Sequence, residues 1–120
     1  MVEEARAANA ARIAERQQDA LEAKLEAQRR EKLQKEKFGD LPGSVSRETL
    51  EAIAECESGG DPEIVSSSGL YYGKYQFSPD TWESVGGNGL PSDAPEAEQD
   101  YRAALLYERS GPGQWPVCGQ

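Results

Sequence analysis

The first third of the chain does not separate apolar from polar positions. From Val2 to Lys37 it contains no glycine or proline and consists mainly of Ala, Glu, Arg, Lys, Gln and Leu, most of which are strong helix formers. The few large apolar side chains are scattered among the charges instead of recurring on one face. This composition predicts one long helix over about residues 3–37.

A coiled coil would require an apolar seam that repeats every seven residues. With Leu21 and Leu25 on that seam, the neighbouring turns supply only small or polar residues: Ala14, Gln18, Gln28 and Lys32. We therefore favour a solvated single helix or spacer that is stabilised by charge pairs between adjacent turns. Self-association, or docking of a protein partner through this helix, is the alternative interpretation.

The pattern changes after residue 38, where four turn-forming residues mark a linker: Asp40, Pro42, Gly43 and Ser44. Beyond it, Ser46 is a suitable N-cap for a helix that ends at Gly59-Gly60. Within this helix the apolar residues recur at helical spacing, and a carboxylate occupies the last position on the same face: Leu50, Ile53, Ala54 and Glu57.

Two more helices are predicted downstream. Ser78-Pro79 begins a short one that Gly86-Gly87 closes, and Asp93 with Glu96 resembles a capping box for a third, which runs to Ser110-Gly111. We expect that third helix to bury Ala97, Tyr101, Ala104 and Leu105. Residues 70–77 are aromatic and punctuated by glycine, which favours a hairpin. The chain is thus expected to be α+β, mainly helical, with a short hairpin and a long helix in front.

Charge and composition exclude several classes of function. Residues 1–38 hold nine Lys/Arg and eight Asp/Glu, whereas residues 39–120 hold four and fourteen, so the balance changes from +1 to −10. An acidic domain repels phosphate backbones and anionic membrane surfaces, so we expect no nucleic-acid partner. The chain has no histidine, which excludes catalysis by a Ser-His or Cys-His pair. It has no apolar run that could span a membrane, and its first residues lack the apolar stretch of a secretory signal.

Glu57 is the candidate for chemistry. It extends an apolar stripe into the last turn of its helix, where desolvation and the negative end of the helix dipole both favour the neutral acid. A glutamic acid that keeps its proton near neutral pH can protonate a poor leaving group such as a glycosidic oxygen. From spacing alone, a glutamate at the exposed end of a helix is the favoured interpretation.

Several ordered motifs resemble the resuscitation-promoting factor family. These motifs are Cys56-Glu57-Ser58-Gly59-Gly60, the run from Tyr71 to Glu83, Gly86-Gly87, and Trp115-Pro116-Val117-Cys118-Gly119. The family consists of transglycosylase-like domains of actinobacterial cell-wall enzymes, related in fold to lysozyme. The resemblance spans about residues 47–119. It implies a small lysozyme-like catalytic domain over residues 47–120, and the change in composition adds a charged helical segment 1–38 and a linker 39–46 in front of it.

The resemblance also implies a site and a reaction. Glu57 would be the only catalytic residue, acting as general acid and then base on the bond between N-acetylmuramic acid and N-acetylglucosamine in peptidoglycan. Whether the product is anhydro or hydrolysed stays open. A non-catalytic module that binds peptidoglycan is the alternative function. The resemblance places Gln76 and Thr81 in the cleft, where their side chains could hydrogen-bond the glycan; a structural role is the alternative. Tyr71 and Tyr72 present flat faces that suit sugar rings, and packing in the core is the alternative for them.

The same resemblance implies a disulfide between Cys56 and Cys118 and, together with this cysteine pair, a secreted or cell-wall location. Two lone thiols are a poor metal site, and we expect no cofactor. Trp82 and Trp115 are expected to be packing residues. The chain departs from the family where Asp61-Pro62 replaces Asn-Trp and where Lys74 replaces a glycine. These departures bear on how the glycan is bound more than on the acid itself.

Overall fold

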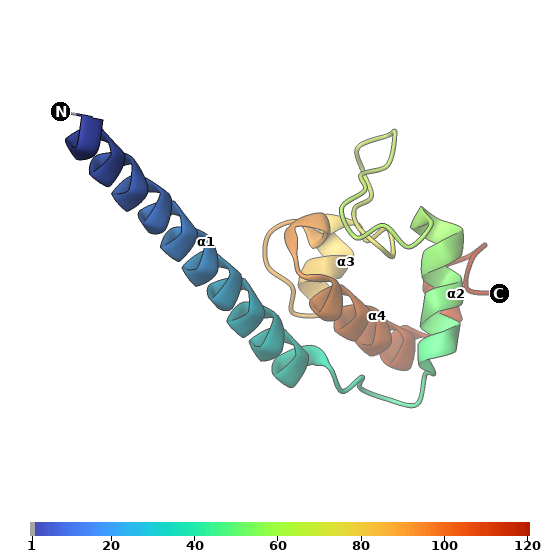
Figure 1. The fold of residues 1–120 in the computed structure, drawn as a ribbon. Coiled ribbons are helices and arrows are strands. Elements are labelled where there is room, and N and C mark those ends of the chain that lie inside the picture. The colour runs from blue at the N-terminus through green and yellow to red at the C-terminus, as the bar shows by residue number, and fades with distance from the viewer. Residues whose placement is uncertain (1) are drawn as a thin grey trace. The chain divides into compact units, whose positions relative to one another are not determined.

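The computed structural model describes residues 2–120 and divides the chain into two compact units, one ending at Leu33 and one running from Gln34 to Gln120 (Figure 1). Met1, the first residue of the predicted segment 1–38, lies outside the described residues. None of the helices in residues 2–120 combines the length and the apolar character needed to cross a membrane.

The first unit is part of a single continuous helix, α1 (Val2–Phe38), which confirms the predicted long helix. Acidic residues occupy its first turn and basic residues its last, which matches the helix dipole. The large apolar side chains of α1 are exposed and form no continuous face: Val2, Ile13, Leu21, Leu25 and Leu33. Only Phe38, which belongs to the second unit, is buried, with its ring edge-on to Tyr101.

The second unit begins its helical part with α2 (Arg47–Ser58). The Ser46 side chain accepts a hydrogen bond from the Thr49 N–H at 3.1 Å, as expected for an N-cap. Gly59 ends the helix with a φ of +67°, a left-handed conformation that glycine adopts at little cost. The apolar positions predicted from the sequence are buried: Leu50, Ile53 and Ala54.

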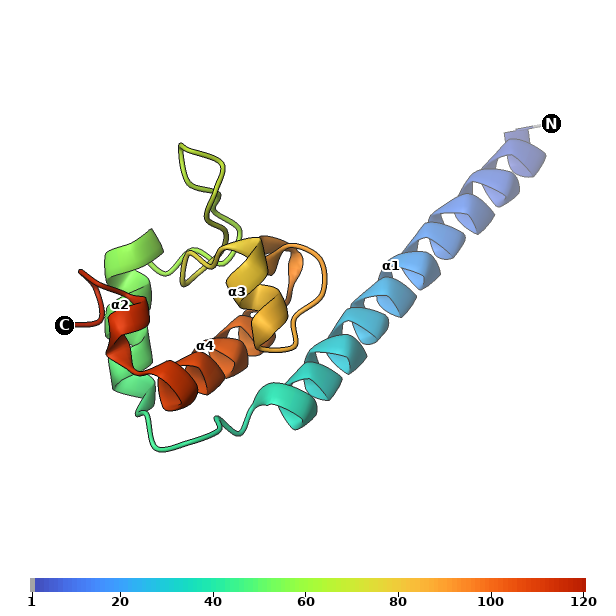
Figure 2. The same cartoon turned by 180° about the vertical axis from the view of Figure 1, so that it is seen from behind.

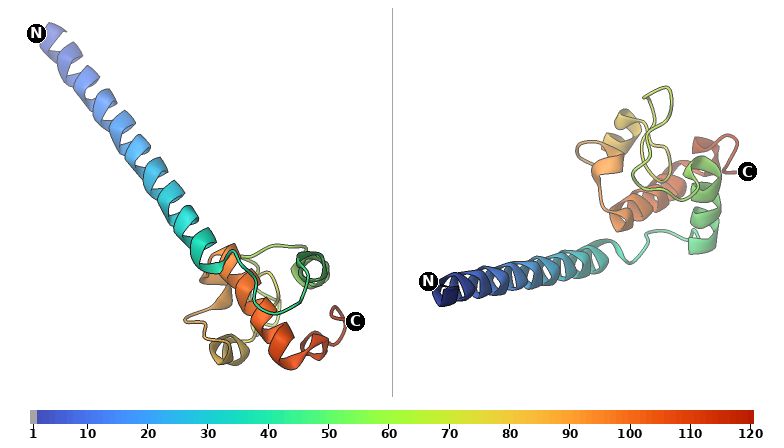
Figure 3. Two further views of the ribbon diagram at one scale, coloured as in Figure 1. Left: turned by 90° about the horizontal axis from the view of Figure 1, so that it is seen from below. Right: turned by 45° about the horizontal axis from the view of Figure 1, so that its top comes forward.

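Two further helices complete the unit, α3 (Pro79–Ser84) and α4 (Glu96–Ser110). They are joined through a 3-10 turn, η1 (Pro91–Asp93), and a second such turn, η2 (Pro112–Gln114), follows α4. Helices α2 and α4 contact each other, and Figures 2 and 3 show them crossing at a steep angle. The mainly helical fold class is therefore confirmed.

Two details of the third helix differ from the sequence-based expectation. The capping box is wrong, because Asp93 lies inside η1 and Pro95 precedes α4 without any side-chain cap. The buried face is also shifted, since Ala97, Tyr101 and Leu105 are only half-buried. The residues that α4 does bury include two polar ones: Gln99, Asp100, Ala103, Ala104 and Leu106. Those polar side chains are buried because they bind the segment described below.

The segment between α2 and α3 folds back on itself, and its yellow-green part protrudes from the helices in Figures 1 and 2. Within residues 2–120, the β structure is limited to two isolated antiparallel bridges, Val65 with Tyr72 and Tyr72 with Phe77. The predicted hairpin over residues 70–77 is thus a tight turn closed by the reciprocal bonds of Tyr72 and Phe77, at 2.9 and 3.0 Å.

Aromatic side chains form much of the core. The rings of Phe77 and Trp82 meet edge-on at 5.1 Å between centroids, and those of Tyr75 and Trp115 at 6.5 Å. Trp82 and Trp115 are both buried, in keeping with their expected packing role. The Trp115 indole N–H donates to the Tyr75 carbonyl at 3.1 Å, which attaches the C-terminal segment to the turn at residues 70–77.

Candidate active site

Glu57 lies in the last turn of α2 and is half-buried. Among residues 2–120 its carboxyl group makes no ion pair and accepts no hydrogen bond that would favour the anion. Burial raises the pKa of Glu57 above the usual range of a glutamic acid. The result is an acid that retains its proton to a higher pH than an exposed glutamate does.

A disulfide stands next to this residue. Cys56 and Cys118 are bonded, with their Cα atoms 5.5 Å apart, which confirms the pairing that the resemblance implied. The bond joins the end of α2 to the end of the chain across 62 positions. It therefore restrains the turn that carries Glu57 from the side of the C-terminal segment.

The turn at residues 71–77 carries three of the predicted glycan-binding residues. Tyr71 is 48% exposed, so much of its ring is open to solvent. The Tyr72 hydroxyl donates to the Gly69 carbonyl at 2.8 Å, which stabilises the protruding loop. Gln76 has a φ of +54°, the only positive value outside glycine among residues 2–120. Non-glycine residues in this region are uncommon and cluster at functional sites.

The side chains of Gln76 and Thr81 are already engaged within the protein. The Gln76 amide donates to the Gly73 carbonyl at 2.9 Å, which supports its unusual backbone conformation. The Thr81 hydroxyl accepts a hydrogen bond from Ser78 at 2.9 Å, next to the N-cap of α3. Both residues are half-buried. A role of either residue toward a ligand stays a prediction.

Lys74 is the residue whose importance the sequence did not reveal. It is 2% exposed, and its ammonium group contacts three carboxylates: Glu51 at 3.0 Å, Glu96 at 3.0 Å and Asp100 at 2.9 Å. Burial alone would lower the pKa of Lys74, but the hydrogen bonds to these carboxylates outweigh it and raise the pKa. The sequence marked it only as a lysine within an aromatic, glycine-rich run, at a position where the family has a glycine, and neither signal indicated an ionic cluster.

Ser58 connects this lysine to the turn of Glu57. Its hydroxyl donates to the Lys74 carbonyl at 2.6 Å and accepts from the Gly60 N–H at 3.1 Å. Ser58 therefore does not bind the Glu57 carboxyl directly, but it joins the end of α2 to residues 71–77. In this way the structure brings the candidate acid and the predicted glycan-binding segment onto one connected framework.

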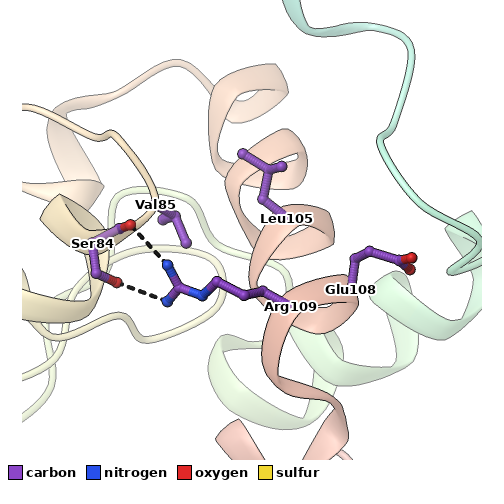
Figure 4. Close-up of a pocket in the computed structure, with 5 residues that line it drawn as sticks. All are labelled: Ser84, Val85, Leu105, Glu108 and Arg109. Atoms are coloured by element: carbon purple, nitrogen blue, oxygen red, sulfur yellow. Dashed lines mark hydrogen bonds between the residues drawn. The ribbon is translucent and has the colours of Figure 1, made fainter.

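The hollow shown in Figure 4 lies elsewhere in the second unit. It has a volume of about 420 Å³ and is lined by Ser84, Val85, Leu105, Glu108 and Arg109. The Arg109 guanidinium spans from α4 to α3 and donates to the Ser84 carbonyl at 2.8 Å and to its hydroxyl at 3.0 Å. None of the predicted site residues lines this hollow.

The second unit is thus a small, disulfide-bonded helical domain that presents a half-buried carboxylic acid at the end of a helix. The chain belongs to the transglycosylase-like domain family, whose model matches residues 44–118. The match covers the second unit from the linker onward and includes Glu57 and both cysteines.

Individual relatives agree with this assignment. The chain is 44% identical over 73 residues to the resuscitation-promoting factor Rpf of Micrococcus luteus, an overlap of 61% of this chain and 32% of that protein. It is 51% identical over 70 residues to the probable transglycosylase SceD of Staphylococcus carnosus, covering 55% and 30%. For RpfD of Mycobacterium tuberculosis the values are 44% over 68 residues, covering 57% and 44%. The chain therefore spans less than half the length of each of these relatives.

Proposed function

We propose that residues 44–118 cleave the glycan strand of peptidoglycan at the bond between N-acetylmuramic acid and N-acetylglucosamine, with Glu57 as the general acid. The observation that carries the proposal is the half-buried Glu57 carboxyl, which has no ionic partner within residues 2–120 and whose pKa is raised by burial. Membership of the transglycosylase-like family, together with the similarity to a probable transglycosylase, supports the choice of reaction.

The proposed reaction uses one carboxyl group twice. Glu57 protonates the glycosidic oxygen as the bond breaks, and the positive charge that develops on the muramic acid ring is relieved by the neighbouring N-acetyl group of the substrate. The Glu57 carboxylate then accepts a proton either from the 6-hydroxyl of the same sugar, which gives an anhydro product, or from water. In two-carboxylate glycosidases the distance between the carboxylates predicts the stereochemistry of the product. With a single carboxylate this rule does not apply.

Glycan-binding residues and a location outside the cytoplasm belong to the same proposal. Tyr71, Tyr72, Gln76 and Thr81 bind the glycan, the rings by stacking and the amide and hydroxyl by hydrogen bonding. Three of them, Tyr71, Tyr72 and Gln76, lie on the 71–77 turn, which is closed by the reciprocal bonds of Tyr72 and Phe77. The protein acts outside the cytoplasm, at the cell wall, where a disulfide such as Cys56–Cys118 persists. The segment 1–38 serves as a helical spacer to this catalytic domain.

Mass spectrometry of purified peptidoglycan after incubation with the protein tests this function. We expect soluble muropeptides from the natural protein and at least about a 100-fold slower release with Glu57→Gln, which cannot donate a proton. Activity should fall as the pH rises through the raised pKa of Glu57, because only the protonated acid is competent.

The matched control is Glu55→Gln, which makes the same chemical change at an exposed position of α2. The function is refuted if Glu57→Gln releases muropeptides as fast as Glu55→Gln does. Binding to the wall without any soluble product from the natural protein would instead identify a non-catalytic binding module. The masses of the products distinguish anhydro-muramyl ends from hydrolysed ends.

A further inference from the structure

Lys74 occupies the point at which three elements of the domain meet. Its side chain reaches Glu51 on α2 and both Glu96 and Asp100 on α4, all at 2.9–3.0 Å. Its backbone N–H donates to the buried Gln99 side chain at 2.8 Å. A buried lysine is costly unless it is paired and hydrogen-bonded, so these contacts fix the position of residue 74 closely relative to both helices.

Lys74 belongs to a network of charged side chains. Three carboxylates contact its ammonium group, and the Arg47 guanidinium lies 4.0 Å from Oδ2 of Asp100. The Tyr75 hydroxyl also donates to Asp100, and burial, together with this bond, raises the pKa of Tyr75. Because two adjacent residues of the 71–77 turn are bound to the same carboxylate, the turn as a whole is held in one place.

Lys74 makes two contacts with α2, the helix that carries Glu57. One is the ion pair with Glu51, and the other is the hydrogen bond that the Ser58 hydroxyl donates to the Lys74 carbonyl at 2.6 Å. Ser58 directly follows Glu57 in the sequence. The same turn carries Tyr71, Tyr72 and Gln76, the proposed glycan-binding residues.

We propose that Lys74 is a positioning residue: through Glu51 and Ser58 it fixes the glycan-binding turn at residues 71–77 against the end of α2, so that a bound glycosidic oxygen lies within reach of Glu57. This inference rests on the proposed function of Glu57 and adds a residue that does not itself touch the substrate. Small displacements of a reacting pair reduce turnover strongly even when the substrate still binds.

The structure offers a matched pair of variants to test it. Glu51 and Glu96 lie at the same 3.0 Å from the Lys74 ammonium, and their side chains are 53% and 55% exposed. They differ in the helix that they belong to, since Glu51 is on α2 with Glu57 and Glu96 is on α4. Removing either leaves Lys74 paired with two carboxylates, so both variants are expected to fold.

The measurement is kcat, KM and the dissociation constant for soluble peptidoglycan glycan fragments, each taken well below the Tm of the variant. We expect Glu51→Ala to lower kcat roughly 10-fold with fragment binding changed less than about two-fold, and Glu96→Ala to leave kcat near the natural value. The double variant Glu51→Ala/Ser58→Ala removes both contacts with α2 and should lower kcat roughly 100-fold.

The outcomes separate this inference from the function on which it rests. Equal kcat for Glu51→Ala and Glu96→Ala, or a folded double variant with natural kcat, would show that Lys74 serves stability alone and would overturn the inference. Those results leave the role of Glu57 intact as long as Glu57→Gln is inactive. Full activity of Glu57→Gln, in contrast, removes the proposed function and this inference together.

Discussion

At the scale of single residues, Gly73 shows how closely the turn at residues 71–77 is packed. It has a φ of +82°, and a Cβ atom at this position would collide with the Gln99 side-chain oxygen, which holds the backbone of Lys74. Gly69, in the same protruding segment, has a similar φ of +73° but no atom within 4 Å of the position of a Cβ.

Alanine substitutions at these two glycines separate the cost of a steric collision from the cost of backbone strain. Gly69→Ala should cost only the strain of a left-handed alanine, about 1 kcal/mol of the free energy of unfolding. Gly73→Ala should cost roughly 2–4 kcal/mol, because the collision with Gln99 adds an overpacking penalty. Urea denaturation followed by circular dichroism measures both. Equal losses would mean that Gln99 moves aside and does not fix the turn.

The raised pKa of Glu57 predicts how the stability of the protein depends on pH. Burial raises its pKa in the folded protein, so between the usual glutamate pKa and the raised value the folded state binds more protons than the unfolded state. The contribution of Glu57 to stability is therefore present at low pH and is lost as the pH rises through that interval.

The neutral isostere Glu57→Gln has no such loss. Its Tm should equal that of the natural protein at pH values below the usual glutamate range and should exceed it at neutral pH, and calorimetry over pH 3–8 measures the difference. Glu55→Gln is the exposed control for the same change. A Tm difference for Glu57→Gln that is constant across this pH range would contradict the desolvation of Glu57.

At the scale of secondary-structure elements, the parts that sequence reasoning predicted are those that local chemistry determines. The caps at Ser46 and Ser78 and the termination at Gly59 depend on residues within one or two turns of each other, and all three form as expected. The periodicity of α2 also predicted its buried face correctly, because the partners of that face are simply apolar.

The features that the sequence did not predict correctly are the burial of Lys74 and the buried face of α4, and both depend on residues that are distant in the sequence. Lysine is normally exposed, and the burial of Lys74 requires carboxylates located 22–26 positions away. The same cluster rotates the buried face of α4 toward Gln99 and Asp100 and away from the predicted one. A periodicity that counts only apolar side chains cannot detect a buried face that is partly ionic. The roles of Tyr71, Tyr72, Gln76 and Thr81 remain predictions.

The disulfide between Cys56 and Cys118 predicts how much of the stability depends on the link between α2 and the C-terminal segment. It connects α2 to the C-terminal segment over a sequence separation of 62, and closure of such a loop stabilises the folded state by about 4 kcal/mol in the chain-entropy model. The variant Cys56→Ser/Cys118→Ser should unfold at correspondingly lower urea concentration, with dithiothreitol treatment of the natural protein giving the same shift. Unchanged unfolding midpoints in both experiments would show that Trp115 and its neighbours hold the C-terminal segment without the bond.

At the scale of the whole molecule, the two units differ in what stabilises them. The unit from Gln34 to Gln120 has a core of aromatic and aliphatic side chains, whereas the apolar residues of α1 up to Leu33 are exposed. The charge follows the same division, since residues 1–38 are nearly balanced and residues 39–120 carry a balance of −10. Helix α1 therefore depends on helix propensity and on contacts between its own turns, such as that of Gln18 with Glu22 at 3.2 Å.

This dependence predicts how α1 behaves when the rest of the chain is removed. A peptide of residues 1–38 should be substantially helical by circular dichroism, with a signal that does not change between about 10 and 500 μM and that decreases in 1 M salt as charge pairs are screened. Light scattering of the full chain and of residues 34–120, the whole second unit, should give a monomer in both cases. Helicity that rises with concentration, together with a dimer only when residues 1–38 are present, would show that the exposed Leu21 and Leu25 pair with a second copy, despite the polar positions between their turns.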